Sequence, residues 1–515
     1  MSYKFNNFYE IITYHSKKHG KKVMLLDNDV KITYKKTLER TDKLAAFLAA
    51  KGVKEGDKVA LFLQNSPEFI YAIFAVSKLG AILVPINTFL KGKELSYLLE
   101  DSGSTALIAS TIYKKVVNDS NANEVCHFVV WEGEKIIADE KNFHFSEVLD
   151  YKLSMENRAR TLEDTAVIIY TSGTTGKPKG AMLSNKNIIS DVHSGQKTVD
   201  VVAKDRSIVF LPMFHSFTFS IGMMLPFYVG GSIVIIKSLK PFSNVFKQVL
   251  TKRVTLFLGI PNIYNALAKA KLPWYFMRFN KLRVFISGAA ALQPKTLDAM
   301  AKKFKRAVLL EGYGLSEASP AVCMNTAKKQ KAGSVGTAMY SYEMKIIDED
   351  MNELPFGGIG DIIVKGDNVM QGYFGHPEVT KETIVNGWLL TGDVGYMDDE
   401  GFLFIVDRKK DLIISKGINI YPREIEEVID LYTGVEASAV IGIVDENSGE
   451  VAVVYIELSE DTKIFDDAGL RKYMRVHLAN YKIPKQIHVI DKLPKNATGK
   501  VLKRVLKEQL RENEK

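Results

Sequence analysis

Three glycines, four hydroxyl residues and two lysines gather in eleven residues, positions 170–180, which read Tyr-Thr-Ser-Gly-Thr-Thr-Gly-Lys-Pro-Lys-Gly. Glycine lets backbone N–H groups approach an anion closely, hydroxyl groups donate hydrogen bonds, and lysine supplies positive charge. Together these residue types are suited to holding a polyphosphate. The donors and glycines of the stretch are Thr171, Ser172, Gly173, Thr174, Thr175, Gly176, Lys177, Lys179 and Gly180.

The spacing of this loop separates it from two common phosphate-binding motifs. A P-loop requires G-x-x-x-x-G-K-[ST], but Gly173 and Gly176 are three positions apart and Pro178 follows Lys177. The G-x-G-x-x-G of a dinucleotide-binding fold does not occur in the stretch either. The alternative is a surface loop with solvated lysines, and the apolar run just ahead of the loop argues against it.

Buried strands must position such a loop, and the sequence predicts them. Residues 165–169 are apolar and rich in β-branched types, so they predict a strand that leads into the loop. Residues 59–85 alternate strand-like, helix-like and strand-like runs, which indicates a parallel sheet with covering helices. Two further predicted strands, 282–290 and 308–317, end in small residues, and open α/β sheets leave room for ligands beyond such strand ends.

The stretch 170–180 resembles, at eleven consecutive positions, the phosphate loop of the adenylate-forming superfamily. That superfamily contains acyl-CoA synthetases, luciferases and the adenylation domains of peptide synthetases. The resemblance covers about residues 10–510 and is strongest to bacterial medium- and long-chain fatty acyl-CoA synthetases. Further motifs follow in the family's order at 211–217, 282–290, 308–317, 386–393, 401–411 and 493–500.

The resemblance implies a nucleotide site with named roles. Tyr313 would lie against the adenine, Ser316 would reach the α-phosphate, and Asp393 would accept from the ribose hydroxyls. Glu317 and Thr171 would bind Mg²⁺, and Lys500 would be the catalytic cation, which makes these three the catalytic residues. The implied ATP- and AMP-binding residues are Thr171, Ser172, Gly173, Thr174, Thr175, Gly176, Lys179, Gly288, Ala289, Ala290, Glu311, Gly312, Tyr313, Gly314, Leu315, Ser316, Asp393, Arg408 and Lys500.

The motif at 211–217 is interpreted as the entrance of the acyl pocket. By resemblance His215, Phe214 and Phe217 gate it, although a lone histidine among apolar residues is more often a core residue. The apolar run that follows could line a fatty tail or belong to the core, and residue types alone favour the core. Residues 212–236 contain no carboxylate, so an amino-acid substrate is disfavoured because its ammonium would be buried without a counter-charge.

We predict an α/β fold with two domains. Residues 1–407 would form a large N-terminal adenylation domain of parallel-type sheets covered by helices, which binds ATP and the acyl group. Residues 408–515 would form a small, mobile α+β lid, with strand-like and helix-like runs between 439 and 490. By resemblance the lid rotates about a hinge near Lys410. Its CoA tunnel would be formed by Ser415, Lys416 and Gly417.

Composition excludes several classes of function. The net charge of +9, from 69 basic and 60 acidic residues, is spread along the chain without the aromatic interleaving of single-strand binders, so we expect no nucleic-acid partner. Two cysteines and a start without an apolar segment favour a cytoplasmic protein. Residues 208–236 lack charge, but prolines and glycines interrupt them, which predicts a buried strand–helix–strand unit and no transmembrane segment. Peripheral membrane contact and a homodimer stay open.

The expected function is the ATP-dependent activation of a medium- or long-chain fatty acid to acyl-AMP and pyrophosphate, followed by transfer to CoA. The expected small molecules are therefore the fatty acid, ATP with Mg²⁺, and CoA. Three alternatives stay open: an aryl or short-chain acid–CoA ligase, a fatty acyl-AMP ligase that loads a carrier protein, and a non-catalytic nucleotide- or nucleic-acid-binding protein. The inserted segment of the acyl-AMP ligases is not found in the sequence.

Overall fold

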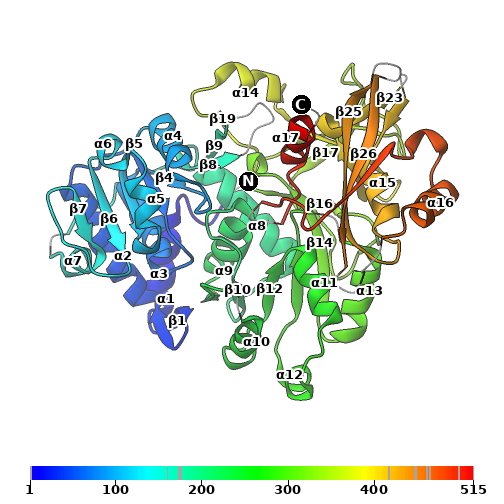
Figure 1. The fold of residues 1–515 in the computed structure, drawn as a ribbon. Helices are drawn as coiled ribbons and strands as arrows, with labels where there is room; N and C mark the ends of the chain where they lie inside the picture. Colours follow the sequence, from blue (N-terminus) through cyan, green and yellow to red (C-terminus); the bar gives the residue numbers. More distant parts are fainter. Residues whose placement is uncertain are drawn as a thin grey trace. The chain divides into compact units, whose positions relative to one another are not determined.

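The structure is a computed structural model, and it describes residues 3–152, 154–158, 160–171, 177–239, 241–290, 292–415, 418–445, 449–459, 462, 465–496 and 499–513. Contacts divide the chain into two compact units (Figure 1). Unit 1 comprises Met1–Glu343 and Val364–Leu389, and unit 2 comprises Met344–Ile363 and Leu390–Lys515. The predicted boundary at 407/408 and the hinge near Lys410 concern rotation rather than contacts, so they remain predictions.

Unit 1 contains an eight-stranded sheet that carries the glycine-rich loop. The strands from β8 to β7 run parallel, whereas β9 and β19 are antiparallel additions at one edge. In spatial order the strands are β19 (Gly372–Tyr373), β9 (Lys179–Ser184), β8 (Thr165–Thr171), β4 (Ile82–Pro85), β3 (Lys58–Phe62), β5 (Ser104–Ser110), β6 (Phe128–Glu132) and β7 (Asn142–His144). The predicted strands at 59–63, 81–85 and 165–169 are confirmed.

Helices cover this sheet, and their ends follow local rules. Helix α3 (Pro67–Leu79) starts at Ser66, whose hydroxyl accepts from Phe69 N–H, and ends at Gly80 in the left-handed region. Eleven of its thirteen residues are buried, which explains its uniformly apolar sequence. The other helices of these segments are α1 (Phe8–His19), α2 (Tyr34–Ala50), α4 (Gly92–Ser102), α5 (Lys114–Asn118), α6 (Ala122–Val125), α7 (Phe145–Asp150), α8 (Asn185–Val199) and α14 (Pro377–Thr383).

A second sheet of unit 1 has nine strands. Its inner strands, from β14 to β1, are parallel, and the added strands at its two edges are antiparallel. The order is β16 (Thr337–Ala338), β15 (Ala321–Met324), β14 (Val308–Gly314), β13 (Val284–Ser287), β12 (Leu256–Gly259), β10 (Arg206–Val209), β11 (Ser232–Ile235), β1 (Val23–Asp27) and β2 (Val30–Thr33). The helices that follow its strands are α10 (Phe242–Thr251), α11 (Pro261–Lys269), α12 (Trp274–Phe279) and α13 (Pro294–Lys303).

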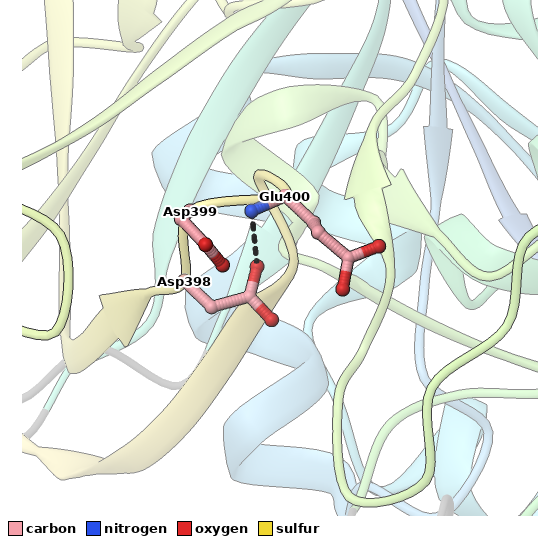
Figure 2. A group of neighbouring side chains, drawn as sticks. All are labelled: Asp398, Asp399 and Glu400. Atoms are coloured by element: carbon pink, nitrogen blue, oxygen red, sulfur yellow. Dashed lines mark hydrogen bonds between the residues drawn. The ribbon is translucent and has the colours of Figure 1, made fainter.

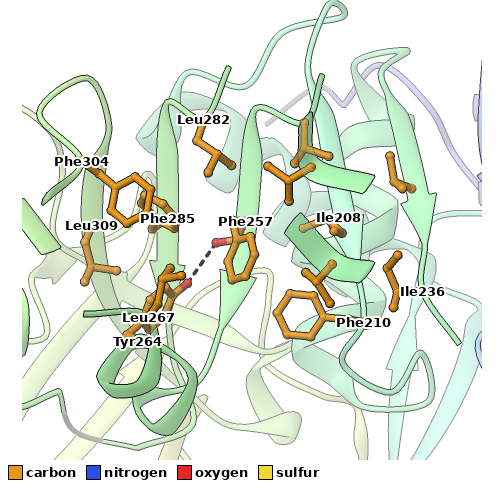
Figure 3. Packing of buried hydrophobic residues seen from close by; sticks show 14 of the residues in the cluster. Ile208, Phe210, Ile236, Phe257, Tyr264, Leu267, Leu282, Phe285, Phe304 and Leu309 are labelled. Carbon is orange, nitrogen blue, oxygen red and sulfur yellow. Dashed lines mark hydrogen bonds between the residues drawn. The ribbon is translucent and has the colours of Figure 1, made fainter. Parts of the chain in front are cut away.

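Aromatic residues fill the core on one face of the nine-stranded sheet (Figure 3). The rings of Phe257 and Phe285, on neighbouring strands, lie 5.6 Å apart between centroids. Tyr264 of α11 is fully buried, and its hydroxyl lies 3.0 Å from Phe257 O and 2.8 Å from Ile286 O. Its phenol therefore finds partners at the strand backbones, as a buried hydroxyl requires.

The uncharged segment 208–236 is folded into this sheet. Strand β10 leads to a π-helix, η2 (Thr218–Met224), then to α9 (Leu225–Tyr228) and to β11, which pairs with β10. The predicted strand–helix–strand unit is therefore confirmed. Among the described residues, every helix is too short or too polar to cross a bilayer.

Unit 2 is built mainly on an antiparallel hairpin of β25 (Val435–Asp445) and β26 (Gly449–Leu458). Helices α15 (Pro422–Ile429) and α16 (Asp467–His477) pack on one face, and α17 (Lys503–Asn513) packs on the other. Its further strands include β23 (Ile413–Ser415), β24 (Ile418–Ile420), β27 (Gln486–Ile490), β18 (Gly360–Lys365), β21 (Trp388–Met397), β22 (Leu403–Arg408) and β17 (Glu343–Ile347), and β20 (Ile384–Val385) pairs with the start of β21. The predicted fold class, a large α/β part with a smaller α+β part, is confirmed.

Candidate nucleotide and acyl site

The glycine-rich loop begins and ends on adjacent antiparallel strands. Thr171 at the end of β8 pairs with Lys179 at the start of β9, so both stand at the base of the loop. A Cβ atom at Gly180 would lie 2.5 Å from Ile168 Cγ2, which explains the third glycine. Ser172, Gly173, Thr174, Thr175 and Gly176 lie outside the described residues, so their assigned roles stay predictions.

Glu317 is the point on which hydroxyl groups of unit 1 converge. Thr171 Oγ1 donates to Glu317 Oε1 at 3.3 Å, and the Tyr373 hydroxyl donates to the same oxygen at 3.0 Å. Tyr373 lies on β19, where it pairs with Ala181 of β9, and Lys179 Nζ lies 5.7 Å from its ring centroid. Burial, and then the charge of Glu317, raise the pKa of Tyr373, so its hydroxyl stays a donor.

The chain around Glu317 is held by residues that sequence reasoning missed. Asn368 is fully buried, and its amide donates to Ala318 O at 3.1 Å and to Ala321 O at 3.0 Å. Met370 N–H donates to Glu317 O at 2.8 Å. The segment 368–373 therefore fixes both the backbone and the carboxylate of the predicted Mg²⁺ ligand.

Asp191 of α8 supports the same turn from the other side. Its carboxyl accepts from Ala321 N–H at 3.1 Å, and complete burial raises its pKa well above the usual value. In the sequence, Asp191 shares a helical face with Ile188 and Gly195, and a carboxylate on an otherwise apolar face was the available signal. Tyr373 carried no comparable signal, because its partner is distant in the chain.

The motif that carries the predicted acyl gate lies next to Ser316, the residue predicted to reach the α-phosphate. The hydroxyl oxygens of Ser216 and Ser316 lie 3.0 Å apart. His215 Nδ1 accepts from Phe217 N–H at 3.3 Å, and burial lowers the pKa of His215 to about 4. The imidazole is therefore neutral at pH 7, which suits a gate or a packing residue rather than a cationic catalyst. Phe214 packs edge-on to Phe89, with 6.5 Å between the ring centroids.

The predicted adenine slot is formed where two parallel strands end. Ser287 of β13 pairs with Glu311 of β14. Gly288 to Ala290 follow β13, whereas Gly312 to Gly314 are the last residues of β14 and Leu315 follows them. A Cβ atom at Gly288 would lie 3.4 Å from the Phe217 ring, so the slot and the acyl gate adjoin. Glu311 is buried and accepts from Leu292 N–H at 2.8 Å, so it supports the loop of the slot.

Two residues of this slot show local backbone constraint. Ala289 has a φ of +70°, in the left-handed region that disfavours a side chain. A Cβ atom at Gly314 would lie 2.0 Å from Pro320 O, so only glycine fits there. Tyr313, which is predicted to face the adenine base, lies on β14 and pairs with Cys323 of the antiparallel strand β15.

In unit 2, the structure brings together four predicted residues. Arg408 Nε lies 3.3 Å from Asp393 Oδ1, and the two residues pair across β21 and β22. Burial, then the charge of Arg408 and to a lesser extent that of Lys410, lower the pKa of Lys500 to about 8, while Asp393 and Asp411 oppose this shift. Lys500 is thus a cation near two other cations. Ser415 ends β23, whereas Lys416 and Gly417 lie outside the described residues.

A separate group of carboxylates lies at the turn between β21 and β22 (Figure 2). Asp398 accepts from Glu400 N–H at 3.1 Å and from Phe402 N–H at 2.8 Å. These hydrogen bonds close the turn, and Asp399 lies between Asp398 and Glu400 in the sequence. We therefore assign the cluster to the turn.

Comparison with protein families identifies both parts of the chain. A family model described as AMP-binding enzyme matches residues 12–374, and another described as AMP-binding enzyme C-terminal domain matches residues 424–500. A long-chain-fatty-acid–CoA ligase of Salmonella typhimurium is 32% identical over 513 residues, covering 93% of this chain and 90% of that protein. A feruloyl-CoA synthase of an Amycolatopsis species is 35% identical over 476 residues, covering 92% of each.

Solved structures show the same fold. The crystal structure of ATP-bound MatB from Rhodopseudomonas palustris superposes with a TM-score of 0.89 at 29% identity, covering 99% of this chain and 100% of that one.

Proposed function

Because the chain belongs to the AMP-binding enzyme family and is an AMP-forming acid–CoA ligase, we propose that its acid is a medium- or long-chain fatty acid. In the first step the carboxylate attacks the α-phosphorus of ATP, which gives acyl-AMP and releases pyrophosphate. In the second step the CoA thiol attacks the acyl carbonyl, the thiol proton is lost, and AMP leaves. The products are acyl-CoA and AMP.

The first step needs alignment and positive charge, because an anion attacks a centre surrounded by anionic oxygens. Thr171 and Ser316 offer hydroxyl donors in unit 1. In unit 2, burial and then repulsion by Arg408 lower the pKa of Lys500, so an added anion would stabilise its charged form there. We therefore assign Lys500 to the developing charge on the α-phosphate.

The residues around Glu317 fit a magnesium ion that accompanies ATP. Mg²⁺ is usually held by one or two carboxylates together with substrate phosphates and water, and Glu317 with Thr171 is such a donor set. When bound, the ion would neutralise phosphate charge. Tyr373 keeps the Glu317 carboxylate in a fixed orientation, which is the contribution of the protein itself.

The second step is assigned to the predicted lid. Rotation about Lys410 would withdraw Lys500 and bring up the strand end at Ser415, with Lys416 and Gly417 next to it, to admit the CoA thiol. The exposed turn η4 (Lys409–Asp411) is a reasonable place for a change in backbone torsion.

The fatty-acid assignment depends chiefly on one contact, between the Ser216 and Ser316 hydroxyls. Ser216 belongs to the uncharged segment 208–236 and Ser316 is the residue assigned to the α-phosphate, so the contact supports an uncharged acyl pocket next to the reacting phosphate. The buried η2 that follows presents Phe219, Ile221 and Met223, and it contains no carboxylate for an ammonium. An apolar tail is the substrate part that such surroundings favour.

The test is pyrophosphate–ATP exchange over a panel of acids, followed by thioester formation with CoA. We expect the largest kcat/KM for octanoate or palmitate, with ferulate, benzoate, anthranilate and acetate lower by roughly tenfold or more, because lost apolar contacts cost about 1–3 kcal/mol per step. A preference for ferulate or benzoate would overturn the fatty-acid assignment. Accumulation of acyl-AMP that CoA does not consume would instead indicate an acyl-AMP ligase.

An aryl acid is the second candidate, because the feruloyl-CoA synthase relative is at least as similar in sequence as the long-chain-fatty-acid–CoA ligase. Phe214, Phe217 and Phe219 could stack on a planar ring as well as pack on an alkyl chain. A series of alkanoates separates the two: a steady rise of kcat/KM with chain length is expected only for a fatty tail.

A further inference from the structure

Helix α12 carries an unusual group of exposed aromatic residues. Trp274, Tyr275 and Phe279 are 75%, 48% and 56% exposed, and they fall within six residues. The Trp274 ring lies 6.2 Å from that of Tyr275 and 6.4 Å from that of Phe279, so the three form one patch. Contiguous exposed apolar patches mark interaction sites more often than scattered residues do.

The protein holds this patch rigidly. Phe276 of α12 is buried against Phe246, with 5.2 Å between ring centroids. Arg306 donates to Met277 O at 2.6 Å and to Arg278 O at 3.1 Å, which satisfies the carbonyls at the end of the helix. The aromatic rings are therefore displayed from an anchored element, beyond α10 at the lower edge of Figure 1.

The stretch of chain that contains α12 is strongly basic. Residues 206–306 contain sixteen lysines and arginines and one acid, Asp298, so they carry +15 in a chain of net +9, and the remainder is net −6. The positive excess is thus concentrated in one stretch of the sequence, which corrects the expectation that it is spread along the chain. Exposed basic residues directly flank the aromatic group: Lys269, Lys271, Arg278 and Lys281.

We propose that the α12 patch, made of Trp274, Tyr275 and Phe279 with Lys271, Arg278 and Lys281, docks unit 1 on an anionic lipid bilayer. Tryptophan and tyrosine rings favour the headgroup level of a membrane, because one end of each ring system is apolar and the other polar. Nearby lysines and arginines are attracted to anionic headgroups. The Arg278 guanidinium lies 5.7 Å from the Phe279 ring centroid, so a positive charge and an apolar ring would meet the bilayer surface at the same place.

The shape and composition of the patch favour a bilayer over a nucleic acid. Single-stranded nucleic acids are bound in basic grooves that track the backbone past successive stacked bases. Helix α12 instead lies at the lower edge of unit 1 in Figure 1, and its three exposed rings can enter the plane of a headgroup layer. The patch lies outside the proposed active site, so its test requires neither ATP nor an acid.

The experiment is flotation of the full-length protein with phosphatidylcholine vesicles, with and without phosphatidylglycerol. We expect binding only to the anionic vesicles, and loss of binding at high salt. Replacing Lys271, Arg278 or Lys281 by glutamine should each weaken partitioning roughly fivefold, since one basic residue near the surface contributes about 1 kcal/mol. Trp274→Ala with Phe279→Ala should abolish flotation at low salt.

Matched control variants distinguish docking through α12 from non-specific vesicle binding. Phe356→Ala removes a similarly exposed ring, 68% exposed, and Lys328→Gln removes an exposed lysine elsewhere, and both should float like the wild type. Trp274 fluorescence gives a second readout: its emission should shift to the blue with anionic vesicles, whereas buried Trp131 should not respond.

Three results would overturn the proposal: equal flotation of the α12 variants and the wild type, equal loss in the Phe356→Ala control, or retention on duplex DNA that requires Trp274 without any vesicle binding. Thermal unfolding midpoints of all variants exclude misfolding as the cause of a loss. Vesicle binding is measured without substrate, so its failure leaves the fatty-acid assignment standing.

Discussion

The carboxylate group of unit 1 and the cation group of unit 2 are held in opposite ways. In unit 1, Glu317 accepts two hydroxyl hydrogen bonds of 3.0 and 3.3 Å, and Asn368 fixes its backbone surroundings. In unit 2, Lys500 lies near Arg408 and Lys410, and its pKa is lowered to about 8. The carboxylate of the first group already accepts hydrogen bonds, whereas in the second group Asp393 and Asp411 offset three cations only in part, so that a positive excess remains for an added anion.

This difference suggests a division of work. A preorganised carboxylate needs no rearrangement before a substrate arrives, and such preorganisation is a main source of electrostatic catalysis. A cluster of repelling cations instead gains free energy when it meets a phosphate. Binding and chemistry can therefore be coupled through unit 2, and variants of each group should fail in different steps.

The largest effect is expected for Lys500→Ala. Removing the cation should slow adenylate formation by roughly 10²–10³-fold, as loss of one preorganised donor typically does. Thioester formation from supplied acyl-AMP should stay near wild type, because the proposal assigns Lys500 to the first step. Pyrophosphate–ATP exchange and single-turnover thioester assays measure the two steps. Equal loss in both would remove the distinction drawn between the units.

Lys410→Pro should show the reverse pattern. Fixing the backbone φ at the predicted hinge should spare exchange and slow thioester formation by about 10²-fold, since a small misplacement of reacting groups has costs of that order. The matched control is Lys409→Pro, one residue earlier, which alters the same turn without touching the assigned hinge. If both substitutions damage exchange, the hinge lies elsewhere.

The pH profile of the first step should report the pKa of Lys500. The folded value, about 8, lies below the ordinary one, so the side chain is a cation below pH 8 and becomes neutral above it. Exchange should therefore decline above pH 8, by about tenfold for each pH unit, if the cation is required. Thioester formation from acyl-AMP should lack this inflection. A flat exchange profile between pH 7 and 9.5 would contradict the role.

The smallest effect is expected for Tyr373→Phe. Loss of one hydrogen bond to the Glu317 carboxylate should raise the Mg²⁺ concentration needed for half-maximal exchange by roughly two- to tenfold, corresponding to about 0.5–1.5 kcal/mol. The maximal rate at saturating Mg²⁺ should change less. Tyr9→Phe, which removes a phenol that donates to a different carboxylate, Asp42, at 2.8 Å, is the matched control. A lower maximal rate with an unchanged Mg²⁺ requirement would show that Tyr373 serves only packing.

Local patterns predicted much of the fold. Runs such as 165–169 and 59–63 are apolar and short, and they became β8 and β3 because central parallel strands are buried on both faces. The helix-like run within 59–85 became α3, which Ser66 caps at its start and Gly80 at its end. These features depend on neighbours in the chain, which a sequence displays directly.

The supports of the site could not be predicted in this way. Tyr373 lies 56 residues from Glu317, and Asp191 lies 130 residues from Ala321, so their pairing depends on strand order and on how the helices pack. The sequence spacing of these residues does not predict either contact. Likewise, the pKa of Lys500 is lowered first by burial and then by Arg408, and only the fold produces either of these surroundings.

Strand β19 has a consequence for how the protein is made. Its two residues close the edge of the eight-stranded sheet next to β9, yet they come after residues 344–363, which belong to unit 2. A nascent polypeptide that has reached residue 343 therefore still exposes the unpaired backbone of β9, and open edges of this kind invite aggregation. Synthesis must pass through a segment of the second unit before the first can be completed, so a fragment ending at residue 343 should be prone to misassembly.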